Sequence, residues 1–214
     1  MGHIERAHQI GRALAAAPPD ELAARLAELT DEQRAAAIEA LTVAANLLVP
    51  DAVGDRTVIV RPHRDGDLGW IASRNGAVYA DEFGWTDGYE ALCAQIVAEF
   101  DRDFAEGRDR AFIAEVDGAR AGCALVRQRT DDEAQIRLVL TERWARGLGL
   151  GRRLVGECIE FARAAGYSSV MLWTNDVLDA ARHIYEAFGF ELVEEDPHHS
   201  FGHDLVGQVW RLDL

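Results

Sequence analysis

The sequence predicts an α/β protein, in which a mixed central sheet is flanked by helices and preceded by a short all-helical arm. Three observations predict this class. Residues 1–49 are rich in alanine and leucine and show no strand pattern. From residue 56 onward, short β-like runs alternate with helix-like segments, and three alternating glycines mark one strand-to-helix junction. This order is typical of a sheet covered by helices.

The arm, residues 1–55, is predicted to be helical. His3 to Ala17 is helix-like, Pro18-Pro19 breaks it, and Asp20 can cap a second segment. Thr30 to Gln33 has the spacing of a capping box before a further apolar-periodic segment. Helices this short cannot bury their apolar stripes alone, so a partner surface is expected. Pro50 to Asp55 is interpreted as a linker.

Residues 56–214 are predicted to form the sheet and its helices, with a tight hairpin at Asp117-Gly118. The expected strands are Val58–Arg61, Phe112–Val116, Ala124–Arg127, Glu133–Thr141, Val170–Thr174, Phe190–Glu194 and Val206–Leu212. The expected helices are Asp67–Glu82, Gly88–Phe104, Arg152–Ala165 and a helix that carries Ala180 to Phe188 and ends at Gly189.

Composition argues against several classes of partner. The chain has 22 basic residues against 37 acidic ones and a formal net charge of −15, which opposes binding to nucleic acid or to an anionic membrane and mildly favours amine acceptors. No apolar run approaches the roughly 20 residues of a membrane span, and a signal-peptide pattern is absent, so a cytoplasmic protein is predicted. Cys93, Cys123 and Cys158 have no metal-site spacing and are interpreted as buried apolar side chains; no metal is expected.

The glycine-rich junction at Arg146 to Leu154 carries the strongest functional signal. Glycines at the start of a helix expose backbone N–H groups at the positive end of the helix dipole, which suits a phosphate chain. The spacing matches neither the dinucleotide fingerprint nor the P-loop. A ligand with a pyrophosphate is therefore expected, and the glycine spacing argues against a nucleotide-binding dehydrogenase.

Two motifs in the correct order resemble one family. Arg146 to Gly151 is similar to the R/Q-x-x-G-x-G/A loop of the GCN5-related N-acetyltransferases (GNAT). About two dozen residues later, Trp173-Thr174-Asn175 and then Ala181 to Phe190 resemble that family's L-x-T-N … A-x-x-x-Y-E-x-x-G-F segment. The resemblance covers about residues 56–214 and implies the GNAT fold, with acetyl-coenzyme A (acetyl-CoA) as cosubstrate.

The resemblance also implies a cofactor site. The main chain at Leu140 and Thr141 would bond the pantetheine arm, and amides of the glycine loop would bind the pyrophosphate. Asn175 would bond a pantetheine amide or a water, although its position also suits a plain helix cap. The expected cofactor-binding residues are Leu140, Thr141, Arg146, Gly147, Leu148, Gly149, Leu150, Gly151, Arg152 and Asn175.

The catalytic groups are less completely predicted. The resemblance implies that Tyr185 donates a proton to the departing sulfur. The alternative is that Tyr185 is only an aromatic side chain of the core. Many relatives carry a glutamate on the strand before the loop, where this chain has Gln135 and Arg137, so the base is unassigned. The candidates are Glu82 and the three histidines His198, His199 and His203, and a water path is the alternative. The expected acceptor-pocket residues are Tyr79, Phe83, Trp85, His198 and His199, the two histidines lying in a loop before the last strand.

The predicted function is an acetyl-CoA-dependent N-acetyltransferase that acts on a small-molecule or peptide amine. Direct attack is expected because no Cys or Ser lies in a nucleophile motif. A non-catalytic acetyl-CoA sensor that signals through the arm is the alternative; Tyr185 favours catalysis and the missing strand glutamate favours the sensor. The arm resembles the dimerisation helices of MarR-type regulators without their winged-helix segment, which predicts a homodimer that does not bind DNA. Packing of the arm on its own chain is the other possibility.

Overall fold

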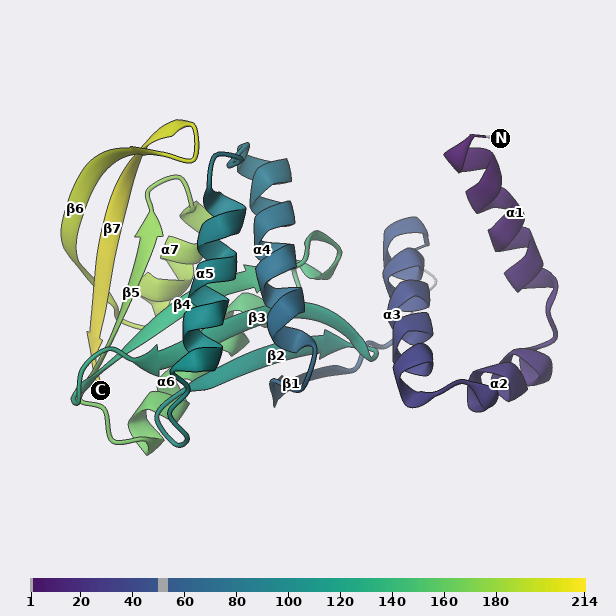
Figure 1. The fold of residues 1–214 in the computed structure, drawn as a ribbon, viewed down its shortest axis with the longest axis horizontal. Coiled ribbons are helices and arrows are strands. Elements are labelled where there is room, and N and C mark those ends of the chain that lie inside the picture. The colour runs from purple at the N-terminus through teal and green to yellow at the C-terminus, as the bar shows by residue number, and fades with distance from the viewer. Residues whose placement is uncertain (1, 50–53) are drawn as a thin grey trace.

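The computed structural model describes residues 2–49 and 54–214, and its centre is a seven-stranded sheet with helices on both faces (Figure 1). The order of the strands is β1-β2-β3-β4-β5-β7-β6. All neighbouring strands are antiparallel except β4 and β5, which are parallel. The predicted fold class, a mixed sheet flanked by helices and preceded by a helical region, is therefore confirmed.

The elements follow the predicted order along the chain. The helices are α1 (His3–Ala16), α2 (Pro19–Glu28), α3 (Asp31–Leu48), α4 (Asp67–Phe83), α5 (Tyr89–Arg102), α6 (Leu150–Ala164) and α7 (Asp179–Ala187). The strands are β1 (Val58–Pro62), β2 (Arg110–Val116), β3 (Ala119–Gln128), β4 (Glu133–Thr141), β5 (Ser169–Asn175), β6 (Glu191–Ser200) and β7 (His203–Asp213), with a 3₁₀ turn, η2, at Arg143–Ala145.

Strand β6 is longer than the sequence predicts. The predicted strand ends at Glu194, but the ladder with β7 continues to the pair Ser200↔His203. Phe201 and Gly202 close this hairpin with φ angles of +58° and +84°, the left-handed backbone that two-residue hairpin loops require. The expectation that His198 and His199 lie in a loop is wrong, because both belong to β6.

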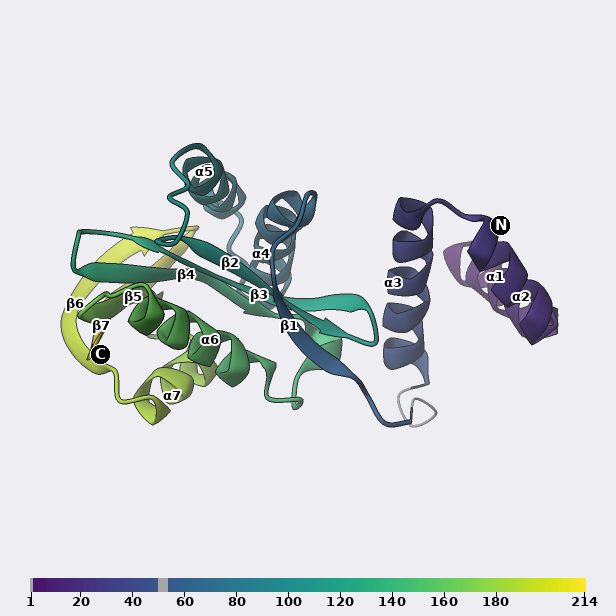
Figure 2. The ribbon, with the colours of Figure 1, turned by 90° about the horizontal axis from the view of Figure 1, so that it is seen from below.

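Two apolar layers cover the sheet. Helices α4 and α5 lie on one face and α6 and α7 on the other (Figure 2). Leu154 and Ile159 of α6 pack against the sheet on one side, and Ile71 of α4 and Phe100 of α5 pack on the other. Because each layer buries a helix stripe against strands, the sheet itself is held rigidly between them.

A bulge in β4 separates that strand from β5. The two strands pair only as far as Ile136↔Leu172. Leu138 then has a φ of +50°, and the register between β3 and β4 shifts at the same place. Ile136 packs in the α6 layer, whereas Leu138 packs with the α4 and α5 layer. Such a bulge bends its strand, and beyond Ile136 the edge of β4 that faces β5 has no strand partner among the described residues.

The arm contacts the rest of the chain through α3. The capping box predicted at Thr30 and Gln33 is present. Glu39 of α3 pairs with Arg120 at 2.8 Å, while α1 and α2 contain no buried residue. Of the linker expected at Pro50 to Asp55, residues 50–53 lie outside the described residues. Within the described ranges, no helix is both long and apolar enough to cross a bilayer.

Candidate functional site

Two adjoining cavities lie where β4 and β5 separate. The first, here called the tyrosine cavity, has a volume of about 350 Å³ and is lined by Tyr79, Tyr89 and Tyr185 among others. The second, the loop cavity, has a volume of about 300 Å³ and reaches Arg146 and Gly151 at the glycine-rich junction. Tyr79, Val139, Leu178 and Ala181 line both cavities. The two cavities therefore adjoin, and together they are called the passage here.

The glycine loop leaves an open helix terminus next to Gly151, which lines the loop cavity. Gly149 caps α6, and Gly147 and Gly149 have φ angles of +83° and +73°. A Cβ atom built on either glycine would meet no atom within 4 Å. Free N–H groups and open space at the positive end of a helix suit an anion. At Gly151 the added Cβ would lie 2.9 Å from Ile184 Cδ1, so this glycine permits α6 to approach α7.

The other predicted cofactor residues divide into three groups. Leu140, Thr141 and Arg146 line the loop cavity. Leu148 and Leu150 instead pack in the α6 layer of the core. The Arg152 guanidinium lies 4.9 Å from the centre of the Phe188 ring, and Arg152 lines a surface hollow that Gly149 also lines.

The unpaired edge of β4 passes the loop cavity. Val139, Leu140 and Thr141 follow the bulge and have lost β5 as a partner. An extended ligand with amide groups can bond such an edge as an added strand does. The strand end and the glycine loop together can therefore hold a molecule with an amide-containing arm and a phosphate chain.

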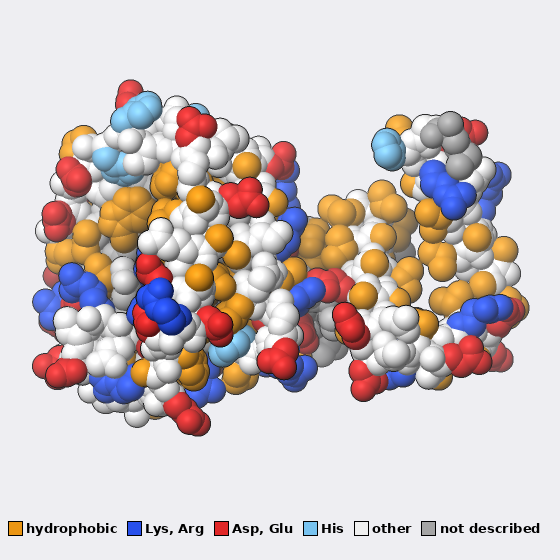
Figure 3. All heavy atoms as spheres, viewed as in Figure 1, with side chains coloured by type: hydrophobic (Ala, Val, Ile, Leu, Met, Phe, Trp, Pro, Cys, Tyr) orange, Lys and Arg blue, Asp and Glu red, His pale blue; other side chains and the backbone are white. Residues whose placement is uncertain are grey.

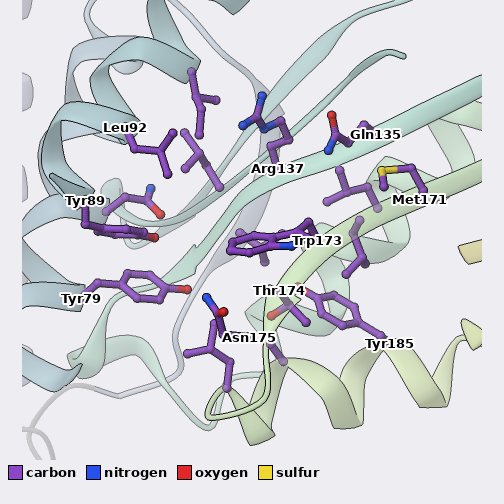
Figure 4. Close-up of a pocket in the computed structure, with 18 of the residues that line it drawn as sticks. Tyr79, Tyr89, Leu92, Gln135, Arg137, Met171, Trp173, Thr174, Asn175 and Tyr185 are labelled. Carbon is purple, nitrogen blue, oxygen red and sulfur yellow. The ribbon is translucent and has the colours of Figure 1, made fainter. Parts of the chain in front are cut away.

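Tyr185 projects from α7 into the wall of the tyrosine cavity (Figure 4). Burial raises the pKa of this phenol well above its usual value, so the hydroxyl keeps its proton at neutral pH. Within the described parts of the chain the hydroxyl has no hydrogen-bond partner, while the ring packs near Phe190. Tyr185 is therefore a neutral donor that is open to a ligand in the cavity.

Asn175 is oriented by a histidine on β6. Its Oδ1 lies 3.1 Å from His198 Nε2, and His198 Nδ1 lies 2.9 Å from Ser200 Oγ. Because an amide oxygen only accepts hydrogen bonds, His198 Nε2 is the donor in its contact with Asn175. This arrangement turns the Asn175 amide nitrogen toward other partners. Asn175 lines the tyrosine cavity, whereas His198 and His199 line a shallow hollow on the outer surface.

An aromatic cluster forms one wall of the tyrosine cavity. Tyr79 stacks on Trp85 with ring centres 5.2 Å apart, and Tyr89 lies 5.0 Å from Tyr79. Of the three aromatic residues predicted here, Tyr79 and Trp85 line this cavity, while Phe83 lines the loop cavity. Burial raises the pKa of both Tyr79 and Tyr89, so both phenols are neutral.

Glu82 lies on the loop side rather than in the tyrosine cavity. Its side chain is 10% exposed and lies 3.0 Å from Arg143 and 2.7 Å from Arg146. Both partners are arginines at the entrance to the glycine loop. The carboxylate is thus held by two cations and lines the loop cavity, whereas Tyr185 lines the tyrosine cavity.

Several pocket residues were missed by the sequence analysis. Tyr89, Met171 and Trp173 line the tyrosine cavity together with Gln135 and Arg137 (Figure 4). Trp173 is 44% exposed on a strand that is otherwise buried, and it lies over Gly207, where any Cβ would be 3.0 Å from the indole. A large aromatic side chain at the end of the apolar run 170–173 is the signal that could have indicated it.

Comparison with known proteins gives a consistent result. The sequence profile of the acetyltransferase (GNAT) family matches residues 70–190, more than half of the chain. The mycothiol acetyltransferase of Thermomonospora curvata is 33% identical over 146 residues, which are 66% of this chain and 45% of that protein. The N-acetylaspartate synthetase of Danio rerio is 34% identical over 85 residues, which are 39% of this chain and 30% of that protein. Both alignments span less than half of the relative's own length.

Solved structures share the fold at low identity. The Salmonella typhimurium protein yncA, whose structure holds its cofactor acetyl-CoA, superposes with a TM-score of 0.57 at 20% identity. The alignment covers 73% of this chain and 93% of that one. An N-acetyltransferase of Staphylococcus aureus superposes with a TM-score of 0.60 at 18% identity over 73% and 98% of the two chains.

Proposed function

The chain belongs to the acetyltransferase (GNAT) family, and from that premise we propose that it transfers an acetyl group from acetyl-CoA directly to an amine. The observation that carries the proposal is the divergence of β4 from β5, which connects an open glycine loop to a cavity that contains a neutral tyrosine. A cofactor arm and an acceptor can meet at this point from opposite sides.

The cofactor is proposed to lie in the loop cavity. Its pyrophosphate would face the amides at the start of α6, with Arg146 beside it, and the pantetheine arm would follow the free edge of β4 at Leu140 and Thr141. The acetyl-CoA held by the Salmonella protein supports this choice of cofactor. Asn175, with its amide nitrogen available, would donate to the arm or to a water near the thioester.

The chemistry needs a free amine and a stable leaving group. As the amine nitrogen bonds the acetyl carbon, the carbon–sulfur bond breaks and the thiolate takes a proton that Tyr185 provides. Tyr185 then regains a proton from water. The amine proton passes to water, which is the path favoured by a cavity whose lining contains no carboxylate among the described residues. Burial and the nearby Arg137 cation both lower the pKa of an ammonium group, so the reactive free amine is favoured.

Glu82 has a different proposed role from that of a base. It acts as the counter-ion of Arg143 and Arg146, and the incoming pyrophosphate replaces it at Arg146. This exchange would leave the charge of the loop balanced both before and after the cofactor binds.

The arm, residues 1–55, is proposed to be a dimerisation element outside a catalytic domain that spans residues 56–214. Ile4 is 87% exposed and Leu48 is 78% exposed. Figure 3 shows hydrophobic atoms gathered on facing sides of α1 and α3. Such a surface favours pairing with a second copy. The likeness to MarR dimerisation helices agrees with this role, and the acidic charge of the chain opposes nucleic acid as a partner.

The experiment is a panel of amines incubated with acetyl-CoA and the full chain, with release of free thiol measured over time. Sustained release that depends on one class of amine, together with the acetylated amine in the mass spectrum, is the expected result. Coenzyme binding without release for any amine would contradict catalysis and leave a binding protein.

A further inference from the structure

The lining of the tyrosine cavity differs in charge from the rest of the chain. The protein has 37 acidic and 22 basic residues, yet the described residues around this cavity include two arginines and no carboxylate. One of these, Arg129, is paired with Glu133. The other, Arg137, has neither an ion pair nor a side-chain hydrogen bond within residues 2–49 and 54–214. Within the described parts of the chain, the cavity therefore holds one positive charge without a direct ion-pair partner, which the nearby Glu99 carboxylate compensates only in part.

The bulge in β4 places Arg137 at the wall of the tyrosine cavity. Leu138, with its positive φ, packs in the α4 and α5 layer, and Arg137 comes just before it at the wall of the tyrosine cavity. The guanidinium is half-buried, and burial lowers its pKa. The neighbouring Arg127 cation lowers this pKa further, while Glu99 and Cys93 raise it. A partly desolvated cation without a partner is costly. A ligand that brings a negative charge would remove this cost.

Gln135 adds a neutral donor beside this cation. It lies two residues before Arg137 on the same strand, and both side chains leave the same face of β4 in Figure 4. The structure gives Gln135 no side-chain partner among the residues it describes. Met171 and Trp173 of β5 complete that part of the wall with apolar surface. One cation without an ion-pair partner, one amide and apolar walls can together recognise a ligand.

We propose that the amine accepted by this protein also carries a carboxylate, and that Arg137, assisted by Gln135, binds this carboxylate. The inference rests on the proposed acetyl transfer, whose acceptor class it names. A guanidinium binds a carboxylate through two parallel hydrogen bonds, which fixes both position and direction. The amine would then lie toward the β4–β5 gap and Tyr185. A single arginine matches the one negative charge of a carboxylate better than the larger charge of a phosphate monoester.

The test compares matched acceptors, each an amino acid and its carboxamide, at a fixed acetyl-CoA concentration. Rates are divided by the fraction of unprotonated amine, because the amide group lowers the pKa of the neighbouring amine. The wild-type chain is expected to show a KM about 10- to 100-fold lower for the acid than for the amide, the range of a charge-assisted hydrogen bond. Arg137→Gln should remove this difference, and Arg137→Lys should retain part of it.

The control variant is Arg163→Gln, which removes the same charge from an exposed pair with Glu160 on α6. It should keep the wild-type preference. Equal use of acids and amides by the wild-type chain would overturn the inference while leaving acetyl transfer intact. A preference for an aminoalkyl phosphate over the amino acid and its carboxamide would also overturn the inference. Retention of the acid preference by Arg137→Gln would also overturn it.

A second measurement separates this inference from the proposed function. Calorimetric titration with an N-acetyl amino acid and with its carboxamide needs no turnover. Binding of the acid by the wild-type chain, and its loss in Arg137→Gln, would support the carboxylate site even if no amine were acetylated. Absence of acid binding in both chains would overturn it. Coenzyme binding by each variant, measured as a thermal shift, shows that the variants are folded.

Discussion

Arg146 Nη2 donates to both carboxylate oxygens of Glu82, at 2.7 and 2.8 Å, although the two residues are 64 positions apart in the sequence. Arg143 adds a second cation at 3.0 Å from the same carboxylate. The pair joins the end of α4 to the entrance of the glycine loop. A pyrophosphate at the start of α6 would meet a cation that is already oriented and that already has a counter-ion.

The first prediction follows from this pair. Glu82→Gln removes a negative charge near the proposed pyrophosphate site, so coenzyme A should bind about 2- to 5-fold more tightly. The effect is small because solvent reaches the pair through Arg146, whose side chain is 49% exposed. The kcat should stay within about twofold. Asp81→Asn, which changes the same charge at a carboxylate that is 67% exposed, is the control and should have a smaller effect. A fall in kcat of about 100-fold in Glu82→Gln would instead identify a general base.

The second prediction concerns the glycine loop. Coenzyme A at about 100 times its Kd should stabilise the chain by roughly 2.7 kcal/mol, visible as a higher Tm. Gly149→Val should abolish the shift, because a branched side chain would fill the open space at the start of α6. Gly166→Val is the matched control: its φ of +82° is close to the +73° of Gly149, and its Cβ also meets no atom within 4 Å. Gly166→Val should lower the Tm of the chain but keep the thermal shift that coenzyme A produces. A response to NAD or ATP but not to coenzyme A would contradict the proposed site.

The third prediction concerns Tyr185. Tyr185→Phe keeps the ring packing and removes the hydroxyl, so kcat should fall by about 10²- to 10⁴-fold with unchanged coenzyme affinity. Tyr167→Phe, which loses a hydrogen bond to the Arg108 carbonyl away from the cavities, should keep its kcat. Single-turnover kinetics, in which chemistry limits the rate, is the suitable measurement. An unchanged rate would mean that Tyr185 serves only in packing.

The pH profile gives a separate check on Tyr185. Burial raises the pKa of the phenol, so its protonated, donating form persists to higher pH than that of an ordinary tyrosine. We expect the single-turnover rate of the wild-type chain to show no decline from tyrosine ionisation below about pH 10, the usual tyrosine value. A loss of rate near neutral pH that disappears in Tyr185→Phe would contradict this assignment.

The fourth prediction concerns the arm. Light scattering of the full chain at micromolar concentration should give twice the monomer mass. Leu47, which is 60% exposed, lines an apolar groove on α3 with Val43 and Ala40. Leu47→Glu should shift the protein toward monomer, since it places a charge in this groove. Leu192→Glu, at a leucine of β6 that is 42% exposed, should not. A wild-type chain that is monomeric under these conditions would exclude the dimer.

Much of the fold could be read from the sequence because its signals are local. The capping box at Thr30 and Gln33 needs only four residues, and the hairpin at Asp117-Gly118 needs only the turn preferences of two. The glycine loop is likewise a local device, since its backbone conformation depends on residues that tolerate a positive φ. Helical and strand periods then place the elements between these markers in the correct order.

The tertiary structure alone decided which side chains meet at the site. The positive φ of Leu138 is unusual for a leucine and has no local sequence signal, yet the bulge it forms separates β4 from β5. Glu82 could be assigned to a pocket wall, but its partners Arg143 and Arg146 come from a distant segment. Arg137 looks like any polar residue of a strand until the packing of α4, α5 and β5 removes water from around it. Solvation and long-range charge depend on every element that surrounds a group, and only the folded chain brings those elements together.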